Sequence, residues 1–197
     1  MKIIELIIDE EQELFGIDAI SLVENPAILS NWLALNENKT MFAQANEEKR
    51  ILIGPALIPD KPIYRNNGDG EFHVYFAKKT VRRAMELFFK YGNQGNATLE
   101  HEHKLNGLNV VESWIVENKE MDKSALYNLD VPVGTWMVSM KIENDAIWDE
   151  WVKSKRVKGF SIEGFFIDKI ESENRAKMTE ELTEILAEAV SKNVKFK

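Results

Sequence analysis

The chain has 197 residues, no cysteine and a formal net charge of −8. A chain of this length can bury a sizeable core without cross-links, and the lack of cysteine excludes disulfides and thiolate metal ligands. The acidic balance argues against a nucleic-acid partner, and no apolar run approaches the about 20 residues that cross a bilayer. We therefore expect a cytoplasmic protein without a signal peptide, a nucleic-acid partner or a membrane partner.

The first half of the chain is predicted to contain strands followed by one helix. Strands rich in branched and aromatic residues are expected at residues 2–9, 15–23, 50–58 and 71–76. Residues 36–49 are polar, and a mobile loop is expected there. The asparagine- and glycine-rich residues 65–70 predict a turn that places residues 71–76 in a hairpin. Apolar residues recur every three or four positions over 79–91, which predicts a helix that Gly92 ends.

The second half is predicted to hold further strands and two helices. Strands are expected at residues 97–103, 108–116, 134–142 and 157–168. A turn at 104–107 would pair the first two as a hairpin, and residues 145–154 have the spacing of a short helix. From residue 172 onward the spacing is that of an amphipathic helix. Its apolar positions are Met178, Leu182, Ile185, Leu186, Ala189 and Val190. We expect an α+β fold, mainly an antiparallel β-barrel or sheet with a few helices.

The stretch from Gly159 to Gly164 contains a serine that could act as a nucleophile. Serine is a weak nucleophile and needs a neighbouring base, which is usually a histidine. In a strand, Ser161 shares a face with Glu163, while the apolar Phe160 and Ile162 point to the other face. The second glycine comes one residue too late for a Gly-x-Ser-x-Gly elbow. An ordinary strand serine with a structural role fits the same pattern.

The segment Leu99–His103 supplies two of the three histidines, and either could be the base. His101 and His103 lie two residues apart, so both would face one side of a strand. If the turn lies at 104–107, antiparallel register makes Glu112 a diagonal neighbour of His101 on the same face. Glu112 could then orient the imidazole, and Glu163 is the alternative. A His-x-His pair near carboxylates also fits a metal-dependent hydrolase.

Six segments, taken in order, resemble one family. They are Ile17–Ala27, Gly54–Asp60, Leu99–His101, Val111–Glu117, Pro132–Met137 and Lys158–Gly164. With these segments the chain resembles the tailed-phage prohead maturation proteases, in their phage serine protease branch, and distantly the herpesvirus assemblins. The resemblance covers roughly residues 15–170, and six segments in the right order are more specific than any one of them.

The resemblance implies a herpesvirus-protease-like fold and a serine endopeptidase that cleaves scaffold or capsid precursor inside the immature prohead. Residues 1–171 would form the protease domain, and residues 172–197 would be a helical scaffold or assembly segment. Capsid and scaffold proteins would be the substrates, and self-association would be expected. The expected location is the host cytoplasm, inside the prohead or virion. The resemblance implies neither a cofactor nor a metal.

The resemblance also implies roles for single residues. Ser161 matches the nucleophile, and His101 matches the base because the histidine of the family directly follows Leu-Glu. Assemblins use a second histidine as third member, but the remaining His73 lies upstream on a different predicted strand. The third member is therefore expected to be Glu112, with Glu163 or His103 as alternatives. The alternative to a serine endopeptidase is a non-catalytic, scaffold-like capsid assembly protein or, as a weaker choice, the metal-dependent hydrolase.

Overall fold

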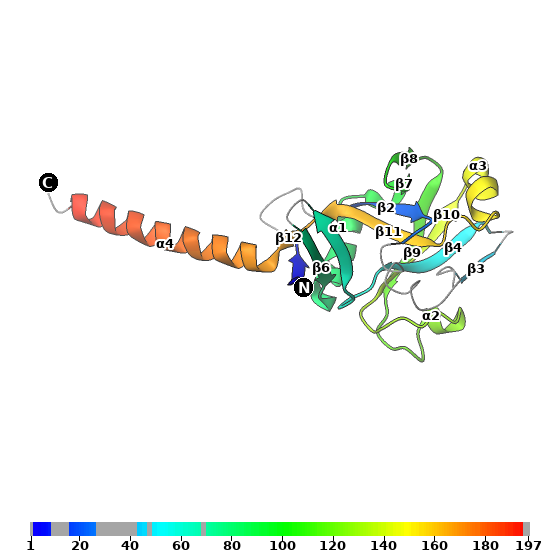
Figure 1. Cartoon of the computed structure of the whole chain (residues 1–197), viewed down its shortest axis with the longest axis horizontal. Helices are drawn as coiled ribbons and strands as arrows, with labels where there is room; N and C mark the ends of the chain where they lie inside the picture. The colour runs from blue at the N-terminus through cyan, green and yellow to red at the C-terminus, as the bar shows by residue number, and fades with distance from the viewer. Residues whose placement is uncertain (1, 9–15, 27–42, 47–48, 68–69, 195–197) are drawn as a thin grey trace.

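The computed structural model describes residues 2–8, 16–26, 43–46, 49–67 and 70–194. These residues form an α+β fold with three four-stranded sheets and mainly antiparallel pairing, as predicted. The sheets pack together at one end of the molecule, and the last helix extends away from them (Figure 1). No sheet closes into a barrel within the described part of the chain, so the structure has the sheet form of the expected fold.

The first sheet joins the two ends of the protease region. Its strand order is β12-β1-β6-β5. The strands are β1 (Lys2–Ile7), β5 (Ile63–Asn67), β6 (Gly70–Phe76) and β12 (Ile167–Asp168). β5 and β6 form the hairpin that the turn residues predicted, whereas β1 runs parallel to β6. This sheet places Arg65 and Phe76 beside the segment that follows Ser161.

The second sheet forms the centre of the core. Its order is β3-β4-β10-β9. The strands are β3 (Ala43–Asn46), β4 (Ile51–Leu57), β9 (Leu108–Ile115) and β10 (Trp136–Ile142). β10 is buried along almost its whole length because it has strands on both sides and α1 packs against it. The fully buried Trp136 contacts the ring of Phe88 on α1 (Lys78–Lys90) edge to face, with 5.4 Å between ring centroids.

The third sheet carries the candidate catalytic segments. Its order is β11-β2-β7-β8. The strands are β2 (Gly16–Val23), β7 (Ala97–Leu99), β8 (His103–Leu105) and β11 (Gly159–Phe165). β11 pairs antiparallel with β2, and β2 pairs parallel with β7. This sheet therefore brings together residues that are more than 60 positions apart in the sequence.

The remaining helices are short, apart from the last. They are the 3-10 turn η1 (Asn93–Gly95), α2 (Lys123–Leu126), α3 (Asp145–Ile147), the π-helical turn η2 (Trp148–Val152) and α4 (Lys169–Val194). α4 contacts β1 and β12 near its beginning and then projects from the sheets (Figure 1). None of the described helices combines the length and the apolarity needed to cross a membrane.

Two predictions of local structure need correction. The hairpin expected between residues 97–103 and 108–116 is wrong, because β9 pairs with β10 and β7 pairs with β2 and β8. The loop expected at 36–49 contains a strand, since residues 43–46 form β3 against β4. Residues 36–42 and 47–48 lie outside the described part of the chain.

Candidate active site

A row of hydroxyl side chains crosses three strands of the third sheet. Ser161 on β11 lies opposite Ser21 on β2, and Ser21 lies opposite Thr98 on β7. Directly opposite residues in neighbouring strands point to the same face, and the strands are about 4.8 Å apart. The three hydroxyl side chains therefore share one face of the sheet. Ser161 lies on β11, which is an edge strand of this sheet.

His101 lies just beyond this row, in the tight turn between β7 and β8. Glu100 and His101 have φ values of 51° and 60°, and the Glu102 amide donates to the Leu99 carbonyl at 3.1 Å. This is the geometry of a type I′ turn, whose two central positions normally hold asparagine and glycine. Left-handed backbone at two successive non-glycine residues costs about 1 kcal/mol or more each, and such strain concentrates at functional sites.

The turn is held in place by hydrogen bonds to β2. The Glu100 amide donates to the Leu22 carbonyl at 3.0 Å, and the His101 amide donates to Ser21 Oγ at 3.1 Å. Ser21 is fully buried, so its hydroxyl has no access to solvent. The buried hydroxyl thus ties the backbone of His101 to the strand that pairs with the serine strand.

Glu163 reaches across β2 to the histidine. Its carboxylate oxygen Oε1 lies 3.2 Å from His101 Nδ1, and the Thr98 hydroxyl donates to the same oxygen. Ala19 is the strand partner of Glu163 on β2, and its small side chain leaves room for this crossing. A neutral imidazole that donates from Nδ1 to this carboxylate has Nε2 as its unprotonated nitrogen, and Nε2 has no hydrogen-bond partner among the described residues. An imidazole oriented in this way can accept a proton.

Ser161 is half-buried and lies on the same face of β11 as Glu163. Its hydroxyl makes no direct hydrogen bond to His101 or His103 in the described structure. Ser161 and His101 therefore both neighbour Ser21, but their side chains form no hydrogen bond with each other. Catalytic hydrogen bonds are often loose in structures without substrate.

Glu112, the predicted third catalytic residue, does not belong to the site around His101. It is on β9, where it faces Ser139 of β10 and accepts hydrogen bonds from Lys123 Nζ and, at 2.6 Å, from Ser139 Oγ. The hydrogen bond from Lys123 and the one from Ser139 lower the pKa of the Glu112 carboxyl. The predicted register that made Glu112 a diagonal neighbour of His101 is wrong, because β9 pairs with β10 rather than with the histidine segment.

His103 and the histidine pair also differ from the predicted arrangement. His103 begins β8, its side chain is 75% exposed, and its Nε2 lies 3.8 Å from Glu102. His101 lies in the turn instead of a strand, so the two imidazoles have different carboxylate neighbours. The described residues contain no group of three or more histidine and carboxylate side chains that could hold a metal ion.

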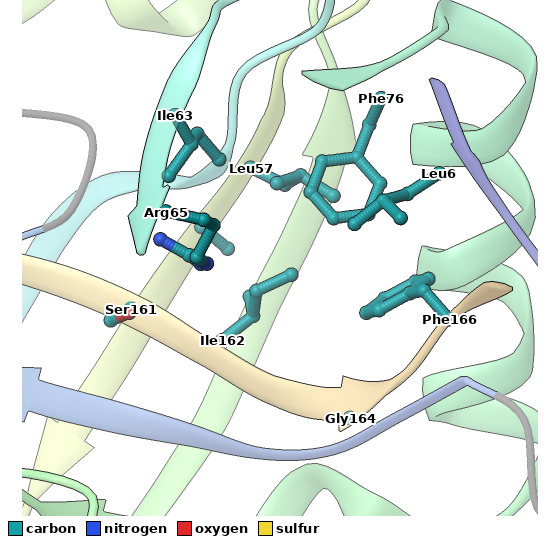
Figure 2. A pocket seen from close by; sticks show the side chains of 10 residues that line it. Leu6, Leu57, Ile63, Arg65, Phe76, Ser161, Ile162, Gly164 and Phe166 are labelled. Carbon is teal, nitrogen blue, oxygen red and sulfur yellow. The ribbon is translucent and has the colours of Figure 1, made fainter. Parts of the chain in front are cut away.

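A cavity of about 230 Å³ adjoins Ser161. Figure 2 shows it along the edge of β11 that faces away from β2. Side chains from the first two sheets close it on the other side. Its lining residues are Leu6, Ala56, Leu57, Ile63, Arg65, Phe76, Ser161, Ile162, Gly164 and Phe166. A cavity that is lined mainly by apolar residue types, with an arginine and a candidate nucleophile beside them, has the make-up of a substrate-binding site.

Three residues of this site, namely Ser21, Thr98 and Arg65, were not predicted from the sequence. Ser21 interrupts the apolar run from Ala19 to Val23, which is a signal for a buried polar group with a specific partner. Thr98 carries no such signal, because threonine is common in strands. Arg65 belongs to a segment that was predicted to be a turn, and only the packing of the first sheet against β11 brings it to the cavity.

Residues 38–171 match the family described as "Putative phage serine protease XkdF". The match includes Ser161, His101, Glu163 and Glu112. The chain belongs to this family of phage serine proteases. Membership assigns it to the serine-type peptidases. No curated protein and no solved structure matches the chain, so the distant relation to herpesvirus assemblins stays a prediction.

Proposed function

We propose that the chain is the serine endopeptidase of phage capsid assembly, with Ser161 as nucleophile, His101 as general base and Glu163 as the residue that orients His101. The contact between His101 Nδ1 and Glu163 Oε1 at 3.2 Å is the observation that carries this proposal. It gives the imidazole a fixed carboxylate partner on the face of β11 that also bears Ser161. In this proposal Glu163 takes the role that the sequence analysis gave first to Glu112.

The reaction would be acyl transfer. Ser161 Oγ attacks the carbonyl carbon of the scissile peptide while its proton passes to His101 Nε2. The tetrahedral intermediate collapses when the protonated imidazole gives that proton to the leaving amine, which breaks the C–N bond. Water then attacks the acyl carbon while its proton passes to His101. The ester bond between this carbon and Ser161 Oγ breaks, the new carboxyl terminus leaves, and the imidazole returns the proton to Ser161 Oγ. Glu163 stabilises the imidazolium in both steps.

The proposed substrates are scaffold and capsid precursor inside the immature prohead, in the host cytoplasm. Support comes from the family match and from the chain's segments that resemble prohead maturation proteases. The long helix α4 projects from the protease region and would serve self-association or attachment to scaffold (Figure 1).

Co-expression with the capsid and scaffold proteins of the same phage tests this function. We expect shortened capsid or scaffold chains with the wild-type protein and full-length chains with Ser161→Ala. Labelling of Ser161 by a fluorophosphonate, read by mass spectrometry, checks the nucleophile independently of the substrate. Neither cleavage nor labelling in the wild type would favour the scaffold-like, non-catalytic alternative.

A further inference from the structure

The cavity beside Ser161 combines apolar walls with one cationic side chain. Among the described residues that line it, Arg65 is the only charged one. Figure 2 shows the Arg65 side chain reaching from β5 toward β11, at the end of the cavity where Ser161 lies. The opposite end is closed by the aromatic rings of Phe76 and Phe166, which meet edge to face with 4.7 Å between centroids. The cationic group thus lies at the end nearest to the candidate nucleophile.

Arg65 differs from the other described arginines in its partners. Each of the others forms an ion pair with a carboxylate, in the pairs Arg50–Asp145, Arg82–Glu117, Arg83–Glu86, Arg156–Glu24 and Arg175–Glu171. Arg65 Nη1 donates to the Tyr64 carbonyl at 3.0 Å, and no described carboxylate lies within ion-pairing distance of it. A guanidinium has five N–H donors in a planar fork, so most of them stay available to a ligand.

We propose that this cavity is the subsite for the substrate residue whose carbonyl Ser161 attacks, and that it selects glutamate. The carboxylate would bind the guanidinium of Arg65 in a bidentate manner, which is the geometry that arginine favours. The two methylene groups of glutamate would contact apolar walls such as Leu57 and Ile162. This inference rests on the proposed function, because it takes Ser161 as the nucleophile.

Aspartate and neutral side chains fit this subsite less well. Aspartate has one methylene fewer than glutamate. Its side chain would either lose contact with the apolar walls in order to reach Arg65, or keep those contacts and bind the guanidinium at a longer distance. Glutamine keeps the shape of glutamate but loses the charge, and charge-assisted hydrogen bonds are roughly twice as strong as neutral ones. We therefore expect glutamate peptides to be cleaved about tenfold or more faster than glutamine peptides, measured as kcat/KM.

The test uses the full chain and a mixture of peptides from a digested proteome, with the new termini sequenced by mass spectrometry. For the wild type we expect glutamate to be enriched directly before the cleaved bond. For Arg65→Gln we expect cleavage to continue with that enrichment lost, and for Arg65→Glu we expect a shift toward lysine or arginine. Arg82→Gln is the matched control, since it removes an exposed arginine of α1 and should leave the preference unchanged.

A second measurement separates this inference from the proposed function. Diphenyl phosphonate analogues of glutamate and glutamine react with a serine nucleophile, and labelling rates are read from the intact mass. Faster labelling by the glutamate analogue in the wild type, but not in Arg65→Gln, supports the subsite. If a small fluorophosphonate labels Ser161 while the two analogues react equally, the subsite is overturned and the proposed function stands. If Arg65→Gln slows both analogues equally, Arg65 acts on the reacting centre and the glutamate subsite is overturned. If no reagent labels Ser161, both proposals fail.

Discussion

His101 Nδ1 lies 3.2 Å from Glu163 Oε1, although 62 positions separate the two residues in the sequence. The contact exists because β2 pairs with β11, which carries Glu163, on one side and with β7, which leads into the turn that carries His101, on the other. Ser21 of β2 holds the backbone of His101, and its strand partner is Ser161. One buried strand thus positions all three groups of the proposed triad.

Ser161→Ala and His101→Ala should each reduce peptidase activity to background while leaving the melting temperature nearly unchanged. The two residues act in the same proton transfer, so the double variant should be little worse than either single one. His103→Ala is the matched control, because His103 is largely exposed and contacts Glu102. Loss of activity in His103→Ala with activity kept in His101→Ala would move the base to His103.

Glu163→Gln should lower kcat by about 10²-fold or more, since the amide can no longer stabilise the imidazolium. The matched control is Glu112→Gln, which changes the same residue type on β9, where its partners are Lys123 and Ser139. We expect Glu112→Gln to keep near-normal kcat. The reverse result, with Glu112→Gln inactive and Glu163→Gln active, would restore Glu112 as the third catalytic member.

Stability at acid pH should depend on Glu112. The hydrogen bonds from Lys123 and Ser139 hold the pKa of Glu112 below its ordinary value of 4.5 in the folded state. A folded pKa below the unfolded one stabilises the protein above the unfolded pKa, and this contribution is lost as the pH falls through the folded pKa. Glu112→Gln should therefore melt lower than the wild type at pH 7, by a few degrees at most because the pair is partly exposed. The difference should shrink on acidification, as thermal melts between pH 7 and pH 3 would show. A constant difference across this range would contradict the role of the Glu112 carboxylate.

Gly164→Ala should destabilise the fold strongly. A Cβ atom at this position would lie 2.0 Å from the Gly16 carbonyl oxygen, which is backbone of the paired strand β2 and cannot rotate away. The clash would force β2 and β11 apart beside the proposed site, and we expect a loss of several kcal/mol in denaturant unfolding. Gly95→Ala is the control, since its Cβ would approach only the side-chain oxygen of Asn109, at 3.1 Å. Equal stability of the two variants would contradict the tight crossing of the strands.

Deleting residues 172–197 should leave peptidase activity on a small peptide and abolish self-association. Beyond its contacts with β1 and β12, α4 exposes a stripe of apolar side chains, and an isolated helix of this kind is marginal in water. The exposed residues include Met178, Leu182, Ile185 and Leu186. Sedimentation of the full and shortened chains, together with peptidase assays of both, gives the answer. Loss of folding or of peptidase activity in the shortened chain would place α4 in the catalytic unit.

The sequence by itself determined the local elements and two of the proposed catalytic residues. Apolar spacing located α1, and the turn residues before Gly70 located the hairpin of β5 and β6, because both signals depend on neighbours within a few positions. Ser161 and His101 emerged from short segments whose residue types suit a nucleophile and a base. The family match over residues 38–171 confirms the family that these segments indicated.

Only the tertiary structure decided which carboxylate meets His101. Glu112 and Glu163 were both available in the sequence, and the choice depended on whether β9 pairs with the histidine segment or with β10. Strand pairing between distant segments is set by the burial of apolar faces across the whole sheet, and local pattern does not encode it. Here β10 is almost fully buried between β4 and β9, so Glu112 on β9 lies away from His101. The parallel pairing of β2 and β7 places His101 within 3.2 Å of Glu163.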